Sequence, residues 1–413
     1  MRALFVTLPE KSHLFCMTPV AWALRVAGHD VRVASSPQLT DAITGTGLTA
    51  VPVGLAPNMH DGMAHNRESQ ESEFTDWNNP DDAGQTWDSI LLRYKMCVGY
   101  GFVGYNQPMM SDLIKFSRYW RPDLVVWDAL AYAAPLAAHA VGAAHVRSMC
   151  WADVWGAMRR SFLRLRAEAP ADRHEDPMAD WLGEHAGGFS EDMVTGQATI
   201  DSLPASLGAD AGLRRIPVRF VPYNGPAVVA DWLREPPTRP RICLTLGTSN
   251  FERFGGDYVS ISDLLGALAD LDVEVVAALV PDQRASLRSV PSNVRVVQSV
   301  ALNTLLPTCS AVIHHGGFGT YSTALVCGVP QLIVTTTISD HVFRARSLTR
   351  AGAGLYLMAD QLTAAGLRDR VARLLSEPLF LANALRLRDN SLAHPTPHDI
   401  VPTLQDLVAE HRQ

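Results

Sequence analysis

Several features that would assign a chain to a common class are missing from these 413 residues. Only 19% of the residues are charged and the formal net charge is -7, so the sequence offers no basic surface for nucleic acid or for an anionic membrane. No apolar run approaches the roughly 20 residues of a membrane span, and the first one reaches Pro9 too early for a signal peptide. We therefore expect a cytoplasmic protein that binds neither nucleic acid nor membranes.

Metal and disulfide patterns are also missing. The six cysteines are far apart and include no CxxC pair, so neither a zinc knuckle nor a disulfide framework is indicated. Asp270 and Asp272 resemble a metal-binding DxD pattern. They fall where a helix pattern ends and a strand pattern begins, which is the wrong sheet edge for a binding site. The adjacent His314 and His315 point to opposite faces of a strand. We predict no metal site and no cofactor.

Apolar residues in strand and helix patterns are what the sequence does contain. They make up 47% of the chain, which excludes overall disorder, and at roughly 100–200 residues per domain the length predicts two or three domains. The run ALFVTL (3–8) is typical of a parallel strand buried on both faces. Helical spacing from Leu14 to Ala27 and the strand DVRVAS (30–35) follow it. With the run LVVW (124–127), this βαβ pattern predicts a doubly wound sheet.

A second doubly wound pattern begins at RICLTLGTSN (241–250), where another buried strand runs into a turn of small residues. The segment between the two patterns contains five prolines, which favour an extended linker over a regular element. We therefore divide the chain into a first domain (1–220), a linker (221–240) and a second domain (241–413). An alternative for the last helix is that it packs back on the first domain.

Two such sheets in one chain predict a cleft between them, because these sheets bind ligands at the carboxyl ends of their strands. The loop HHGGFGT (314–320) ends a strand and opens a helix, so its glycines and the helix N-terminus favour an anion. The turn GTSN (247–250) adds hydroxyl groups at the corresponding end of another strand. Both loops together are enough for a diphosphate, although plain tight turns are an alternative. The dinucleotide pattern GxGxxG is missing after the first strand, and no Walker A sequence is present.

Ionisable residues follow several of the predicted strands. His13 lies just past the first strand, where its ring can act as a general base near neutral pH. Asp128 ends another strand at the same sheet edge and can accept a hydrogen bond from the imidazole. A surface histidine and a helix N-cap are the alternatives for these two residues. Asp340, followed by His341, can accept hydrogen bonds from sugar hydroxyls or cap the helix that continues through Arg344.

With these residues in place, the chain resembles the glycosyltransferases with the GT-B fold, and in particular the actinomycete enzymes that attach deoxysugars to polyketides, such as the macrolide desosaminyltransferases. The likeness runs nearly end to end through KSHLFCMTPVAWALRVAGHDVRV, WRPDLVVWDAL, RICLTLGTS, LLPTCSAVIHHGGFGT and GVPQLIV. It implies an α/β protein with two Rossmann-like domains facing across a cleft. It also implies inverting transfer of a deoxysugar from a dTDP-sugar to a hydrophobic polyketide-type aglycone in antibiotic biosynthesis.

The resemblance further implies roles for single residues. His13 matches the base that deprotonates the acceptor hydroxyl, and Asp128 matches its carboxylate partner. The positions that match the donor site are Gly247, Thr248, Ser249, Val300, His315, Gly317, Gly319, Thr320, Asp340 and His341. Of these, Val300 matches a contact with the nucleotide base, whereas Ser299 stands where many relatives have an aromatic residue. A metal ion is unnecessary if protein donors stabilise the departing diphosphate.

The acceptor is expected against the first domain, where two aromatic-rich stretches would suit a large apolar aglycone. The aromatic residues concerned are Trp77, Trp87, Tyr94, Phe102, Trp151 and Trp155. Ordinary core packing is the alternative explanation for them. The resemblance adds a helper protein similar to a haem-free cytochrome P450, and a homodimer is a further option. Two rival functions remain, a sugar-nucleotide epimerase of the same fold and a non-catalytic nucleotide-binding protein.

Overall fold

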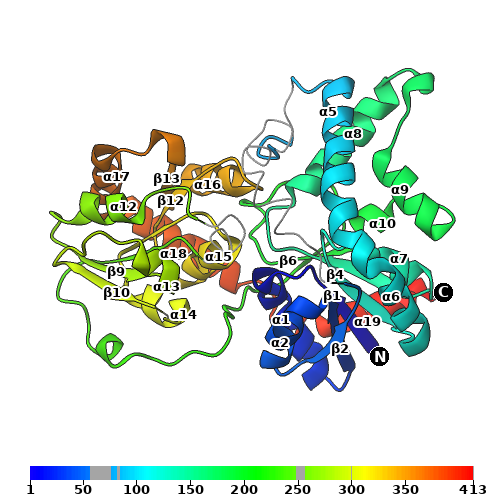
Figure 1. Ribbon diagram of the computed structural model, residues 1–413, viewed down its shortest axis with the longest axis horizontal. Helices are drawn as coiled ribbons and strands as arrows, with labels where there is room; N and C mark the ends of the chain where they lie inside the picture. Colours follow the sequence, from blue (N-terminus) through cyan, green and yellow to red (C-terminus); the bar gives the residue numbers. More distant parts are fainter. Residues whose placement is uncertain (56–75, 81–83, 248–255, 299, 413) are drawn as a thin grey trace.

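The computed structural model describes residues 1–55, 76–80, 84–247, 256–298 and 300–412, and these form two parallel sheets (Figure 1). The first sheet has the order β3-β2-β1-β4-β5-β6-β7 and the second has the order β10-β9-β8-β11-β12-β13. The strands of the first are β1 (Arg2–Val6), β2 (Asp30–Ser35), β3 (Thr49–Pro52), β4 (Leu124–Asp128), β5 (Ala144–Ser148), β6 (Thr199–Asp201) and β7 (Arg215–Pro217). Those of the second are β8 (Arg241–Thr245), β9 (Glu274–Ala278), β10 (Val294–Val297), β11 (Ala311–His314), β12 (Gln331–Thr335) and β13 (Gly354–Met358).

Helices cover both faces of each sheet. With the first sheet lie α1 (Lys11–Val26), α2 (Thr40–Gly45), α5 (Trp87–Met96), α6 (Val103–Trp120), α7 (Ala133–His139), α8 (Val154–Glu168), α9 (Pro177–Ala186) and α10 (Asp192–Thr195). With the second lie α12 (Ile261–Leu268), α13 (Pro281–Ala285), α14 (Leu302–Leu305), α15 (Phe318–Cys327), α16 (His341–Arg350), α17 (Ala364–Ser376) and α18 (Pro378–Leu392). None of the helices in the described part of the chain has the length and apolarity that a membrane crossing needs.

The apolar run of β1 follows from its place in the middle of a covered sheet. Ala3 and Phe5 face the core that contains α1, whereas Leu4 and Val6 face the core that contains α6. All four side chains are buried. A parallel strand with helices on both sides has no face left for polar residues, which is why the alternation of a half-exposed strand is missing here.

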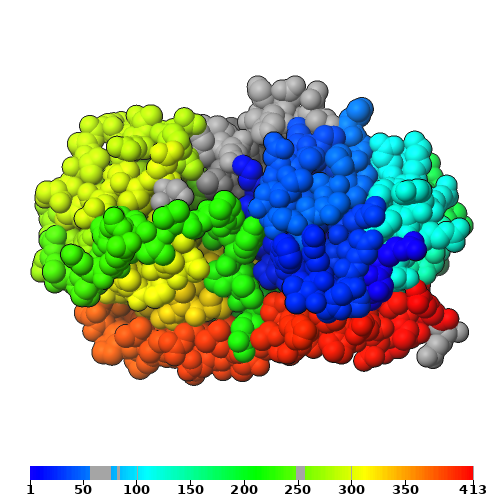
Figure 2. All heavy atoms as spheres, turned by 90° about the horizontal axis from the view of Figure 1, so that it is seen from below, coloured from blue at the N-terminus to red at the C-terminus, as the bar shows by residue number. Residues whose placement is uncertain are grey.

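The carboxyl-terminal helix α19 (Val401–His411) returns to the first sheet. Ile400, Leu404 and Leu407 join the core on the α1 side of that sheet. Figure 2 shows the end of the chain, coloured from orange to red, passing along one side of both halves. At the crossing, the backbone N–H of Arg219 donates to the carbonyl of Pro395, so the two connections between the halves lie side by side.

The two halves share a buried apolar interface. Trp151 and Leu203 of the first half belong to one cluster with Phe318 and Leu348 of the second. Phe220, where the chain leaves the first half, meets Phe318 edge to face, with 6.0 Å between the ring centroids. The interface therefore lies next to the N-terminus of α15.

Both sheets reverse their strand order beside their first strand, between β1 and β4 in one and between β8 and β11 in the other. The connections leaving those neighbouring strands run in opposite directions, which opens a crevice at the carboxyl ends. His13 follows β1 and Asp128 ends β4, while Gly247 follows β8 and His315 follows β11. The predicted ionisable and glycine-rich positions thus fall at the two switch points.

Candidate active site

The first switch point holds a histidine–aspartate dyad. His13 lies in the first turn of α1, and its Nδ1 is 2.6 Å from Oδ2 of Asp128. The Asp128 side chain is 1% exposed and is fixed by two further hydrogen bonds, from the Thr7 hydroxyl to Oδ2 at 3.3 Å and from the Leu130 N–H to Oδ1 at 3.1 Å. Asp128 does not cap α7, whose N-cap position is Tyr132.

This geometry prepares His13 for proton transfer. A carboxylate that accepts from Nδ1–H fixes the tautomer, leaves Nε2 as the basic nitrogen, and stabilises the imidazolium that forms when Nε2 takes a proton. The His13 side chain keeps 17% of its surface exposed, whereas Asp128 is enclosed. The ring of Trp151 lies beside it, with 5.6 Å between the ring centroids. A substrate can therefore reach the imidazole but not its partner.

Cys150 completes the surroundings of the dyad. Its sulfur and the nearest ligand atoms of His13 and Asp128 lie within 4.8 Å of one another, and within the described ranges this is the single cluster of three metal-ligating side chains. Burial, followed by the negative charge of Asp128, raises the pKa of the Cys150 thiol well above its usual range. A protonated thiol is a poor metal ligand, so these residues do not by themselves indicate a resident ion.

The second switch point is lined by glycines that pack against one imidazole. Gly247 has a φ of +71°, and a Cβ atom there would lie 2.5 Å from Cε1 of His315. A Cβ on Gly317 would lie 2.7 Å from Nε2 of the same ring. Both positions therefore require glycine for steric reasons, and the loops after β8 and β11 meet at His315.

His315 is buried and neutral. Burial, followed by the positive charge of Arg344, lowers the pKa of His315 to about 4. Its Nδ1 has no hydrogen-bond partner among the described residues, although the atom is buried. His314 points into the core instead, where its Nε2 lies 2.8 Å from the side-chain oxygen of Gln331. The two adjacent histidines thus have different surroundings.

The helix α15 begins directly behind this ring. Its N-cap is Gly317, which has no side chain to satisfy the first backbone N–H groups. Gly319 and Thr320 belong to the first turn, and a Cβ on Gly319 would come within 3.9 Å of Oδ1 of Asn224. Val300 is partly buried against the neighbouring core. Thr248, Ser249 and Ser299 lie outside the described residues.

Asp340 joins the two halves. It occupies the N-cap position of α16, yet its side chain makes no capping hydrogen bond. Its Oδ2 accepts from Nε of Arg344 at 2.6 Å and from the backbone N–H of Ala152 in the first half at 2.7 Å, and its Oδ1 accepts from Nη2 of Arg344 at 2.8 Å. Asp340 and Arg344 are each 1% exposed. The pair was not predicted, although its i,i+4 spacing on a helix is a usable signal.

Short contacts connect the dyad to the glycine loops. Trp151, which packs on His13, precedes Ala152, and Ala152 donates to Asp340. His341, the next residue, lies with its ring centroid 5.8 Å from that of His315. The candidate base and the candidate anion loops therefore border the same interface and do not lie on opposite surfaces.

The predicted acceptor aromatics fall into two groups. Tyr94, Phe102 and Trp155 are buried together, with 4.6 Å between the rings of Tyr94 and Trp155 and 4.9 Å between those of Phe102 and Trp155. Trp77 is only partly buried and covers this group, 4.5 Å from Trp155. Trp151 lies apart, beside His13. Trp87 is buried against Phe162, with 5.1 Å between the ring centroids. Core packing therefore accounts for Trp87, Tyr94, Phe102 and Trp155 in this structure.

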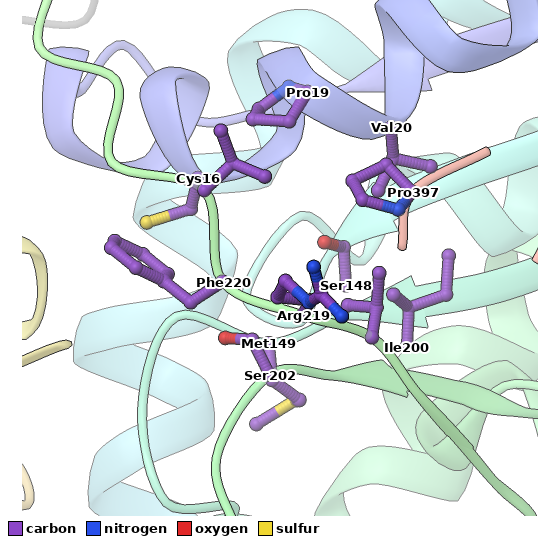
Figure 3. A pocket seen from close by; sticks show the side chains of 12 residues that line it. Cys16, Pro19, Val20, Ser148, Met149, Ile200, Ser202, Arg219, Phe220 and Pro397 are labelled. Atoms are coloured by element: carbon purple, nitrogen blue, oxygen red, sulfur yellow. The ribbon is translucent and has the colours of Figure 1, made fainter. Parts of the chain in front are cut away.

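A small cavity opens beside α1 (Figure 3). It has a volume of about 20 Å³ and is lined by α1, β5, β6 and the segment 218–221, including Cys16, Met149 and Phe220. This is room for about one water molecule and is far below the roughly 300 to 1,000 Å³ of a small-molecule site. It is not the acceptor site.

A basic nitrogen at the switch point of one parallel sheet, next to a glycine-lined helix N-terminus at the switch point of another, is typical of the GT-B glycosyltransferases, and solved structures agree with that class. The glycosyltransferase VinC, solved in complex with dTDP, matches with a TM-score of 0.89 and 39% identity over 99% of this chain and 100% of that one. The spinosyn forosaminyltransferase SpnP matches with a TM-score of 0.84 and 41% identity over 99% of each chain. The predicted GT-B fold is confirmed.

The chain belongs to the Erythromycin biosynthesis protein CIII-like family. Residues 22–247 match the N-terminal domain of that family and residues 262–407 match the C-terminal domain. The aclacinomycin-T 2-deoxy-L-fucose transferase of Streptomyces galilaeus is 45% identical over 100% of this chain and 97% of its own length. The 10-deoxymethynolide desosaminyltransferase of Streptomyces venezuelae is 44% identical over 100% of this chain and 98% of its own. The chain is thus a glycosyltransferase, as its resemblance implied.

Proposed function

We propose that this enzyme transfers a deoxysugar from a dTDP-sugar to a hydroxyl group of a hydrophobic polyketide-type acceptor, with inversion at the anomeric carbon. The observation that carries the proposal is the His13–Asp128 dyad, with its 2.6 Å hydrogen bond, at the interface with the glycine loops. The names of the relatives, which describe transferases of deoxysugars such as desosamine and 2-deoxy-L-fucose, support the substrate class. The VinC complex supports dTDP as the nucleotide.

The two halves divide the substrates between them. Residues 1–220 bind the acceptor, residues 241–413 bind the donor, and residues 221–240 link the two. His13 Nε2 removes the proton as the acceptor oxygen attacks the anomeric carbon, and Asp128 stabilises the resulting imidazolium. A single displacement of this kind inverts the configuration of the sugar.

The departing diphosphate is held by neutral donors at the start of α15. Gly317, Gly319 and Thr320 offer backbone N–H groups at the positive end of the helix, and Nδ1 of His315, which has no partner among the described residues, is available to donate as well. Thr248 and Ser249 are assigned to the same group from the sequence. Fixed donors of this kind stabilise charge that develops on a leaving group, so we propose that the reaction requires no metal ion.

The other donor-side assignments follow the same pattern. Val300 contacts the nucleotide base, and His341 lies beside the diphosphate loop. Asp340 accepts a hydrogen bond from a hydroxyl group of the sugar. Asp340 Oδ1 accepts one bond, from Arg344, among the described residues, and a carboxylate oxygen has room for two. Asp340 is as buried as Asp128, so the sugar reaches this already oriented carboxylate only if the interface around it opens when the donor binds.

The acceptor lies against Trp151, next to the base, with Trp77 as a second apolar surface. Tyr94, Phe102 and Trp155 support that wall from behind. A helper protein similar to a haem-free cytochrome P450 and a homodimer belong to the same proposal. Turnover of the purified enzyme with and without the helper tests the first of these, because full activity alone would end the idea.

Replacing His13 with alanine tests the mechanism. We expect the H13A variant to lose transfer by about 10²- to 10⁴-fold, the range of general base catalysis, and to bind dTDP as the wild type does. The rival epimerase is tested by incubating the donor without any acceptor, since only an epimerase would change the sugar. A binding protein without activity would give no product either with the donor alone or with donor and acceptor together.

A further inference from the structure

The N-cap residue of α16, Asp340, makes no capping hydrogen bond with its side chain. The first N–H groups of a helix need acceptors, which the side chain of the N-cap residue usually supplies to the second or third helical residue. Asp340 holds that position, but its carboxylate is turned toward Arg344 and Ala152. The helix follows the loop that carries the proposed sugar-binding residues, so its first turn matters for the site.

Asn78 of the first half supplies the missing cap. Its Oδ1 accepts from the backbone N–H of Phe343, the third residue of α16, at 2.8 Å. Its Nδ2 donates to the carbonyl of Thr337 at 2.9 Å. The Asn78 side chain therefore holds the loop before α16 and the first turn of the helix, and it is 3% exposed.

The position of Asn78 is fixed from its own side of the interface. Oδ1 of Asp76 accepts from the Asn78 backbone N–H at 2.9 Å and from its Nδ2 at 2.7 Å. The carbonyl of Asp76 accepts in turn from Nη1 of Arg93 on α5 at 2.9 Å. Between these residues, Trp77 packs on Trp155. The segment that presents Asn78 is thus anchored in the half to which we assign the acceptor.

We propose that Asn78 is a positioning residue that aligns the donor sugar with the acceptor by capping α16 from the opposite half. The side chain touches neither substrate in this account. It holds the loop of Asp340 and His341 at one setting relative to Trp151 and His13, and that setting exists only while the halves are together. The inference rests on the proposed placement of the sugar beside Asp340.

Substituting Asn78 with alanine removes both interactions across the interface. We expect kcat of N78A to fall by about 10- to 100-fold, because a reactant that is slightly misplaced reacts much more slowly. The Kd for dTDP alone should stay within about twofold of the wild type, since the proposed diphosphate donors belong to the loops after β8 and β11 and to the first turn of α15, whereas Asn78 bonds Thr337 and Phe343. Asn79→Ala is the matched control, because Asn79 is the next residue and its side chain is exposed. This variant should retain kcat.

A second variant and a direct readout complete the test. Asn78→Asp keeps an acceptor for Phe343 but puts a carboxylate oxygen where Nδ2 donates to Thr337 and to Asp76, so its kcat should also lie well below that of the wild type. Hydrogen exchange of the peptide covering 341–346 should be faster in N78A, with exchange in α15 unchanged. If kcat and exchange in N78A match those of N79A, the inference is overturned. The exchange result stands even if H13A shows that His13 is not the base, so the two proposals fail separately.

Discussion

At the scale of residues, the hydrogen bonds around Asp128 are what distinguish His13 as a candidate base. Asp128 is enclosed and receives hydrogen bonds from His13, Thr7 and Leu130, so its orientation is fixed before any substrate binds. Such preorganisation is the reason a carboxylate beside an imidazole acts through geometry as well as charge. His13 alone could have been any loop histidine, and the pairing is what distinguishes it.

Asp128→Asn tests this pairing. The amide keeps the size of the side chain, but it cannot hold Nδ1 protonated and Nε2 basic in the same way. We expect kcat to fall by about 10²- to 10⁴-fold with the Kd for dTDP unchanged. Asp41→Asn, on the exposed side of α2, serves as the control for a lost carboxylate. Wild-type kcat in D128N would show that Asp128 does not act on His13.

The glycines at the second switch point make a separate prediction. A methyl group on Gly317 would lie 2.7 Å from the ring of His315, so Gly317→Ala must displace that ring or the start of α15. We expect the affinity for dTDP to fall by about tenfold or more, corresponding to about 1.4 kcal/mol. Calorimetric titration measures it. Gly266→Ala is the control, since an added Cβ there meets no described atom within 4 Å apart from its chain neighbours and the backbone of its own helix. Equal affinities in both variants would refute the assignment of the loop.

At the scale of elements, the strands with continuous apolar runs could be predicted from the sequence, whereas the short strands β6 and β7, the strand β13 and the contacts between the halves were not predicted. The apolar run of β1 and the turn after β8 are local patterns, so the sheet edges and the His13–Asp128 juxtaposition followed from them. Asn78 and Phe343 are 265 positions apart, and no local pattern indicates that pair. The aromatic residues Tyr94, Phe102 and Trp155 look alike in sequence whether they line a site or fill a core, and only packing separates the two.

The strand β11 and its loop carry two buried histidines, which link stability to pH. Burial, and then the electrostatic interaction with the neighbouring His315, lowers the pKa of His314 to about 3, and the pKa of His315 is lowered to about 4. The usual value is 6.5, so between pH 6.5 and 4 the unfolded chain binds more protons than the folded one. This contribution to stability is complete above pH 6.5 and is lost as the pH falls.

We therefore expect the free energy of unfolding to decrease as the pH falls from about 6.5 toward about 4. His314→Gln removes one of the two groups. Its unfolding temperature should be lower at all pH values but should change less between about pH 7 and about pH 5 than that of the wild type. The opposite order of slopes would mean that His314 is charged in the folded protein.

At the scale of the whole molecule, the two sheets are held near each other because the chain crosses between them twice. The linker after β7 and the segment before α19 lie side by side at Arg219 and Pro395, which limits how far the halves can separate. Across the interface, Ala152 meets Asp340 and Asn78 meets α16. The proposed base and the proposed donor loops therefore form one site only when the halves are together.

The central claim is that His13 and the glycine loops act on one pair of substrates, and a structure of the enzyme with dTDP and an aglycone bound tests it most directly. We expect the diphosphate at the first turn of α15 beside His315, and an acceptor hydroxyl within roughly 2.6–3.2 Å of Nε2 of His13. A nucleotide bound at another sheet edge, or an acceptor whose hydroxyl group lies away from His13, would contradict the account.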